Sequence, residues 1–200
     1  GRPVSAFRHR ASMITKPEVR AAVLSKLDLF GAATMWDVGA GSGSVAIEAA
    51  RLAPGCRVFA VERDAEDCER IRANATRVAV SVVQGSAPDV RAELPDPDRG
   101  FVGGGGIEVF RAAHARLRPS GVIVATFATL DSASAAVAHL GGDGELVQIG
   151  VNRAVPVGSA GQLRLEAENP VFVVRGSDAC RAARLDHRAG PRAREAAAVR

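Results

Sequence analysis

Trp36-Asp-Val-Gly-Ala-Gly-Ser-Gly-Ser44 connects a short, largely apolar run, Thr34–Val38, to a stretch of helical periodicity that starts at Ser44. Gly39 and Gly41 have no Cβ, so the backbone between them can turn tightly and approach a ligand closely. The first turn of the helix that follows adds unpaired N–H groups and the positive end of a helix dipole. This stretch therefore predicts a strand, a ligand-binding loop and a helix in immediate succession.

The same alternation of short apolar runs and helical stretches continues along the chain, which predicts an α/β fold with a mostly parallel sheet and helices on both faces. The expected strands are Thr34–Val38, Arg57–Glu62, Val80–Gln84, Gly100–Val102, Val122–Phe127, Glu145–Asn152 and Val171–Arg175. The expected helices are Lys16–Leu27, Ser44–Leu52, Ala65–Val78, Ile107–Leu117 and Ser132–Leu140.

Polar residues mark several of the expected helix starts. Thr15 is predicted to cap the first helix, with Glu18 at the third helical position, and Asp64 to cap the third. Asp131 or Ser132 is predicted to cap the fifth. The glycine- and proline-containing stretch Val155–Gln162 is expected to be a flexible connection between the last two strands.

The spacing of the glycines narrows the choice of ligand. A dinucleotide loop has the pattern G-x-G-x-x-G, whereas here the third glycine comes one residue early and Asp37 precedes the first. This variant suits a ligand that carries an ammonium group and no pyrophosphate, which Asp37 would contact directly or through water. Glu62, at the end of the next strand, is placed to accept both ribose hydroxyls, and the turn at Gly85 would lie beside an adenine. Together these features predict S-adenosylmethionine.

Charge and composition argue against several other classes. Residues 1–20 carry a net charge of +4 and residues 177–200 a net charge of +3, while residues 21–176 carry −3. Because the basic residues gather at the ends, the folded body lacks the cationic surface that nucleic-acid binding requires, and an anionic small molecule is the favoured partner. The apolar stretches are too short to span a bilayer, so a cytoplasmic protein is expected. The three cysteines and four histidines show no metal-ligand spacing.

Several motifs together resemble one family, the cobalamin-pathway precorrin methyltransferases that methylate carbon 15 and decarboxylate the ring C acetate. The likeness is to the C-terminal half of the bifunctional carbon-5,15 enzymes. It covers about Phe7 to Gly176 and rests on Phe7-Arg8, Met13-Ile-Thr-Lys16, Glu18-Val-Arg20, Asp37–Gly43, Ala60-Val-Glu-Arg63, Arg72-Ala-Asn74, Gly85-Ser-Ala-Pro88, Phe101-Val-Gly-Gly104, Thr129-Leu130 and Glu168-Asn-Pro-Val171. The chain departs from the family in a short Gly103–Gly106 loop, in Thr126 where an asparagine is common, and in Asp98-Arg99-Gly100.

The resemblance implies a seven-stranded class I methyltransferase fold, a homotetramer without metal, and an N-terminal carbon-5 methyltransferase domain in the same polypeptide. We expect an N-terminal arm over residues 1–14 and a methyltransferase domain over 15–176. Residues 177–200 are rich in alanine and arginine without apolar periodicity, which predicts a frayed helix or disordered tail. The expected cofactor contacts are Thr15, Asp37, Gly39, Ala40, Gly41, Gly43, Ser44, Glu62, Arg63, Gly85, Ser86 and Ala87. The expected substrate-facing residues are Lys16, Gly103, Gly104, Thr126, Arg8 and His9, with Arg10 and Arg20 as further anion contacts. No catalytic residue is assigned.

Four alternatives stay open at this point. An RNA methyltransferase or another small-molecule methyltransferase could use the same fold. Against the former, the part of the Phe101–Gly106 stretch that comes after the expected strand contains no aromatic residue to stack a base. A nicotinamide enzyme is compatible with a glycine loop, and a non-catalytic module could bind the cofactor only to support an oligomer.

Overall fold

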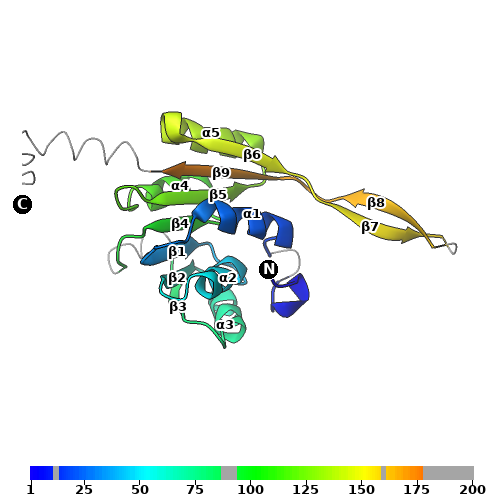
Figure 1. Ribbon diagram of the computed structural model, residues 1–200, viewed down its shortest axis with the longest axis horizontal. Helices are drawn as coiled ribbons and strands as arrows, with labels where there is room; N and C mark the ends of the chain where they lie inside the picture. The colour runs from blue at the N-terminus through cyan, green and yellow to red at the C-terminus, as the bar shows by residue number, and fades with distance from the viewer. Residues whose placement is uncertain (11–13, 87–93, 159–160, 178–200) are drawn as a thin grey trace, which may run out of the picture.

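The computed structural model describes residues 1–10, 14–86, 94–158 and 161–177. A seven-stranded sheet of order β3-β2-β1-β4-β5-β9-β6 forms the centre of the protein (Figure 1). The strands are β1 (Thr34–Val38), β2 (Arg57–Glu62), β3 (Val80–Gln84), β4 (Arg99–Val102), β5 (Val122–Phe127), β6 (Glu145–Ile149) and β9 (Val171–Ser177). The helices are α1 (Pro17–Leu27), α2 (Ser44–Leu52), α3 (Ala65–Asn74), α4 (Gly106–His114) and α5 (Leu130–Leu140), with short 3-10 turns at Val4–Ala6 and Gly141–Asp143.

Six strands, β3, β2, β1, β4, β5 and β6, run in the same direction, and β9 lies antiparallel between β5 and β6. The predicted mostly parallel seven-stranded sheet is therefore confirmed. Asp37 pairs in register with Ala60 on one side and with Phe101 on the other. The carboxyl ends of β1, β2 and β4 consequently lie at one edge of the sheet, where open α/β sheets bind their ligands.

Apolar side chains form a separate core on each face of the sheet. On one face α1 and α2 pack against the strands with Ile71 of α3, burying Val23, Leu27 and Val45. On the other face α4 and α5 contribute Phe110 and the alanines of α5. Both faces are covered, as the near-continuous apolar strands required. No helix within the described residues is long and apolar enough to cross a membrane.

Two predicted helix caps are wrong. Helix α1 starts at Pro17, with Lys16 as the N-cap residue and no side-chain capping bond. A residue before proline is driven to extended backbone, so Lys16 is excluded from the helix and Thr15 lies too far upstream to cap it. Helix α5 is capped by Thr129, which accepts from the Ser132 N–H, and Asp131 lies inside its first turn. The predicted cap at Asp64 is confirmed, since its carboxylate accepts from two N–H groups of α3.

The predicted strand Glu145–Asn152 is also wrong at its end. β6 stops at Ile149, and the chain enters a two-stranded antiparallel hairpin of β7 (Asn152–Val157) and β8 (Gln162–Ala167). This hairpin extends away from the body of the protein (Figure 1). Part of the expected flexible connection, Val155–Val157, is thus strand. β8 has alternating leucines but lacks β-branched residues, so its sequence carries only a weak strand signal.

A buried ion pair fixes the N-terminal segment to the body. Arg20 of α1 is 0% exposed, and its Nε lies 3.0 Å from Glu48 Oε1 on α2. The same glutamate oxygen accepts from the backbone N–H of Arg2 at 2.6 Å, while the Arg20 guanidinium donates to the carbonyl oxygens of Thr15 and Arg2. A buried charge requires such partners, and here they come from the arm, so the first residues are held against α1 and α2.

Candidate functional site

The glycine loop after β1 is held against the end of β2. The N–H groups of Gly39 and Ala40 both donate to the Val61 carbonyl, at 2.9 and 3.2 Å. Gly39 and Gly41 have φ angles of 70° and 55°, a left-handed conformation that side chains other than glycine rarely adopt. The loop thus needs glycine for its shape, as its sequence predicted.

Glu62 joins this loop to the second strand. It is 8% exposed, its Oε2 accepts from the Gly41 N–H at 2.9 Å, and its Oε1 accepts from the Asp64 N–H at 3.0 Å. A carboxylate oxygen has two acceptor positions, so each Glu62 oxygen keeps one position for a further donor. The predicted acceptor of a ribose diol is therefore fixed in orientation and retains the capacity for two hydroxyl groups.

Asp37 is buried beneath the loop with one oxygen free. Its Oδ2 accepts from the Ala46 N–H at 2.8 Å, while its Oδ1 has no hydrogen-bond partner among the described residues. The pKa of this carboxyl is raised from 3.8 to about 7, mainly by burial; the hydrogen bond from Ala46 opposes this rise and the nearby charge of Glu62 adds to it. An unpaired buried acceptor of this kind favours a cationic or proton-donating partner.

The loop after β4 closes the site from the other side of β1. A Cβ on Gly39 would lie 2.9 Å from the Gly104 nitrogen, and one on Gly103 would lie 3.2 Å from the Gly39 oxygen. The Gly103 N–H donates to the Val38 carbonyl at 2.9 Å. Backbone therefore meets backbone across the site, and the predicted substrate-facing Gly103 and Gly104 lie directly beside the predicted cofactor loop.

The turn after β3 lies at the same edge. The Gly85 N–H donates to the Glu62 carbonyl at 2.9 Å, which places this turn next to the strand end that carries the acidic side chain. Ser86 is exposed there, and Ala87 lies outside the described residues. Thr126 lies at the end of β5, two strands from β1, and is half-buried.

Some predicted cofactor contacts have packing roles in this structure. Gly43 and Ser44 are buried, and a Cβ on Gly43 would lie 2.8 Å from the Cγ2 atom of Ile71 on α3. The third glycine thus lets α2 and α3 approach each other. Arg63 is exposed, and Thr15 is half-buried.

Most of the cations predicted to meet an anionic substrate already have acidic partners. Arg20 is buried against Glu48, and Arg10 lies 3.1 Å from Asp64. Lys16 lies 3.0 Å from Glu168 and donates to the Asn169 carbonyl at 2.7 Å. His9 contacts the Arg10 carbonyl at 3.1 Å. Only Arg8 is exposed and has no carboxylate within 4.0 Å among the described residues.

A charged network that the sequence did not reveal explains the position of Lys16. Arg153 of β7 binds Glu18 of α1 with two hydrogen bonds, at 2.7 and 2.9 Å, and Glu168 at 3.0 Å. The hydrogen bonds from Arg153 hold the pKa of Glu18 below its usual range. Hydrogen bonds from Lys16 and Arg153 do the same for the pKa of Glu168. These residues are far apart in sequence, so nothing in the sequence alone predicted their contact.

Asn74 makes a second set of contacts that the sequence pattern did not predict. Its side chain accepts from the Arg8 N–H at 2.8 Å and donates to the carbonyls of Arg8 and Ser42, both at 2.9 Å. It therefore connects the N-terminal arm, the end of α3 and the glycine loop. The available signal was its position in an Arg-Ala-Asn motif at the end of a helix whose start is capped by Asp64.

The sheet order, the backbone cradle and the acid on the second strand define a class I methyltransferase fold. Comparison with known proteins agrees: residues 5–175 match the family described as precorrin methyltransferase domain. The chain belongs to this family.

Three relatives support the assignment. A probable cobalt-precorrin-6B C(15)-methyltransferase (decarboxylating) from Pyrobaculum calidifontis is 43% identical over 80% of this chain and 87% of its own length. A precorrin-6Y C(5,15)-methyltransferase [decarboxylating] from Sinorhizobium is 40% identical over 79% of this chain but only 40% of its own length. The crystal structure of a precorrin-6Y C5,15-methyltransferase from Geobacter metallireducens has a TM-score of 0.80 and 38% identity, covering 88% of this chain and 96% of that one.

The buried carboxyl of Asp37 makes the stability of the ligand-free protein depend on pH. Its pKa is about 7 when folded and 3.8 ordinarily, so between these values the folded protein holds a proton that the unfolded chain has lost. The free energy of unfolding must then fall as pH rises from 4 to 7. Relative to Asp37→Asn, we expect wild type to lose up to about 4 kcal/mol across this range, measured by urea denaturation.

Asp131→Asn, at an exposed position on α5, is the matched control and should follow the wild-type pH profile. Parallel profiles for wild type and Asp37→Asn would show that Asp37 titrates as it does in water.

Proposed function

We propose that this protein methylates carbon 15 of a precorrin with S-adenosylmethionine and decarboxylates the ring C acetate side chain, a step of cobalamin biosynthesis. Relatives that match this chain over most of their own length are named as enzymes of this kind, which supports this reaction. The observation that carries the cofactor assignment is the backbone cradle between Glu62 and the free Oδ1 of Asp37.

The residues of the cradle fit each part of S-adenosylmethionine. Glu62 has acceptor capacity for the ribose hydroxyls, and Gly85 with Ser86 would border the adenine. Asp37 Oδ1 would face the cationic amino-acid end, directly or through water, and a cation there would lower the raised pKa of this carboxyl. Gly39, Ala40 and Gly41 would let the ligand lie against bare backbone. Of the remaining predicted contacts, Thr15, Gly43, Ser44, Arg63 and Ala87 would border or support this cradle.

The protein's part in methyl transfer is mainly alignment. The cofactor, when bound, supplies a methyl group that is bonded to a sulfonium sulfur. Transfer of this methyl group leaves a neutral thioether. The rigid strand ends of β1 and β4 hold the two binding surfaces at a fixed separation, and proximity of this kind provides a large part of such catalysis. Gly103 and Gly104 leave the approach to the methyl group free of side chains, and Thr126, Lys16, Arg8 and His9 would border the substrate.

The chain is proposed to act beside a second domain. It spans about two fifths of the length of the Sinorhizobium relative, which is named as a methyltransferase for both carbon 5 and carbon 15. An N-terminal carbon-5 methyltransferase domain in the same polypeptide accords with that coverage. Residues 15–176 would form the carbon-15 domain, 1–14 its arm and 177–200 its tail.

The hairpin of β7 and β8 supports the proposal of a homo-oligomer, a tetramer as the resemblance implies. Leu163 and Leu165 are 67% and 71% exposed on β8. An isolated two-stranded hairpin is only marginally stable in water, and exposed leucines on a projecting element favour burial against a partner. A second copy of this chain would supply a complementary hairpin with the same apolar residues.

Replacement of Glu62 tests the cofactor site. Glu62→Ala should weaken binding of S-adenosylhomocysteine about 100-fold or more in calorimetry, because two charge-assisted hydrogen bonds are lost. Glu69→Ala removes the same charge from an exposed position on α3 and should bind like wild type. A wild-type affinity in Glu62→Ala, in a variant with an unchanged melting profile, would show that the ribose lies elsewhere.

Incubation with precorrin-6B and methyl-labelled S-adenosylmethionine tests the reaction. We expect the product mass to show one added methyl group and the loss of one carbon dioxide, with the label on carbon 15. Methyl addition without loss of carbon dioxide would contradict the decarboxylating role. Cobalt-precorrin-6B in a parallel incubation distinguishes the two substrate forms that the relatives' names contain.

The oligomer is tested by the double variant Leu163→Ser/Leu165→Ser. Light scattering coupled to gel filtration should give a multiple of the chain mass for wild type and a smaller assembly for the double variant. Leu52→Ser, which removes a similarly exposed leucine (66%) from α2, should keep the wild-type mass. A monomeric wild type would refute the proposed assembly, and equal masses for all three assemblies would place the contact elsewhere.

A further inference from the structure

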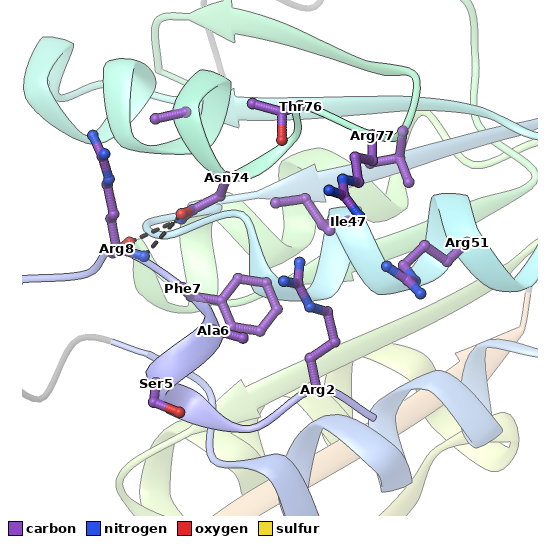
Figure 2. A pocket seen from close by; sticks show the side chains of 12 residues that line it. Arg2, Ser5, Ala6, Phe7, Arg8, Ile47, Arg51, Asn74, Thr76 and Arg77 are labelled. Carbon is purple, nitrogen blue, oxygen red and sulfur yellow. Dashed lines mark hydrogen bonds between the residues drawn. The ribbon is translucent and has the colours of Figure 1, made fainter.

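A cavity of about 460 Å³ lies between α2, α3 and the N-terminal segment, on the outer side of the helices that cover one sheet face (Figure 2). Its lining consists of Arg2, Ser5, Ala6, Phe7, Arg8, Ile47, Arg51, Ala73, Asn74, Thr76, Arg77 and Val78. Neither Asp37, Glu62 nor Gly104 belongs to it, so it is separate from the proposed cofactor site. Its size falls in the usual range of small-molecule pockets.

Three of the four arginines point their charged groups into this space. Figure 2 shows the guanidinium groups of Arg2, Arg51 and Arg77 directed toward one another around Ile47, whereas Arg8 points away along α3. The three come from the N-terminal segment, from α2 and from the turn after α3. The guanidinium group of Arg2 lies against the Phe7 ring, with its central carbon 5.3 Å from the ring centre, a cation–π contact that favours this orientation.

Within the described residues, no carboxylate compensates the positive charge of this cavity. No carboxylate belongs to the lining, and across the described residues none lies within 4.0 Å of the charged groups of Arg2, Arg51 or Arg77. Glu48, the nearby acid on α2, is already engaged by Arg20 and by the Arg2 N–H. Most other arginines in the described part of the chain are paired with an acid. Convergent like charges repel one another, so a negative charge from solution would stabilise this arrangement.

We propose that this arginine cavity, formed by Arg2, Arg51 and Arg77, binds a small anion that carries two or more phosphate or carboxylate groups. A guanidinium presents paired N–H donors whose geometry matches phosphate and carboxylate oxygens. Three such groups from three directions select a multivalent anion over a monovalent one. The hydroxyl of Thr76, also in the lining, offers one further donor.

Calorimetric titration of the whole chain with inorganic pyrophosphate, and separately with citrate, tests this proposal at low, fixed ionic strength. Wild type should bind one equivalent of at least one of them, and the anion that binds identifies the phosphate or the carboxylate class. The double variant Arg51→Gln/Arg77→Gln should weaken binding about tenfold or more, because two charged donors are lost. Arg51 and Arg77 are exposed, so the fold should persist, which a melting profile checks.

Arg111→Gln is the matched control, since it removes one arginine from an exposed site on α4 far from the cavity lining. It should bind the anion as wild type does, and saturating S-adenosylhomocysteine should leave the affinity unchanged. The proposal fails if neither anion binds wild type, or if the double variant keeps wild-type affinity. It also fails if Arg111→Gln is equally impaired, or if S-adenosylhomocysteine displaces the anion.

Discussion

The close approach of two backbone loops at the end of β1 is the constraint on which the site depends. Gly39 and Gly104 meet so closely that a Cβ on the first would lie 2.9 Å from the nitrogen of the second. The strand order puts β4 directly beside β1, so a side chain at Gly39 would push the two loops apart. Because neither loop has side chains at the contact, their carbonyl and N–H groups define the surface that a ligand meets. The backbone of the two loops at this edge of the sheet thus forms the binding surface.

This arrangement has an electrostatic consequence for Asp37. A register position inside a buried sheet excludes water, and among the described residues only one of the two carboxylate oxygens of Asp37 has a donor, the Ala46 N–H. The pKa of about 7 follows because one hydrogen bond does not offset the cost of burying the charged carboxylate. Buried, incompletely satisfied polar groups are costly, and such costs are tolerated where a ligand supplies the missing partner. The unpaired oxygen of Asp37 and the side-chain-free loops thus both favour a ligand-binding site at this edge of the sheet, the first on electrostatic and the second on steric grounds.

Much of this could be predicted from the sequence because it depends on local pattern. Alternating apolar runs gave the sheet and its helices, and the interval from Gly41 to Glu62 placed the acid on the neighbouring strand, where it now accepts from the Gly41 N–H. Contacts between segments that are distant in sequence could not be predicted in this way. The prediction that Lys16 faces a substrate stays untested, and its ion pair with Glu168 has no signal in the local pattern. Gly43 carried a ligand pattern, yet its lack of a side chain also serves the contact with Ile71.

The basic N-terminal segment shows why net charge alone could not assign roles to its cations. Arg20 turns inward to a buried acid, Arg10 meets Asp64 at the surface, and Arg2 converges with two arginines from elsewhere in the chain. All three contribute equally to the net charge of residues 1–20, but of these three only Arg2 has no carboxylate partner for its guanidinium among the described residues. Partner availability, which the fold determines, therefore separates structural cations from those free to attract an anion. The cations of a basic terminus can be assigned to anion binding only after those that form ion pairs within the protein are excluded.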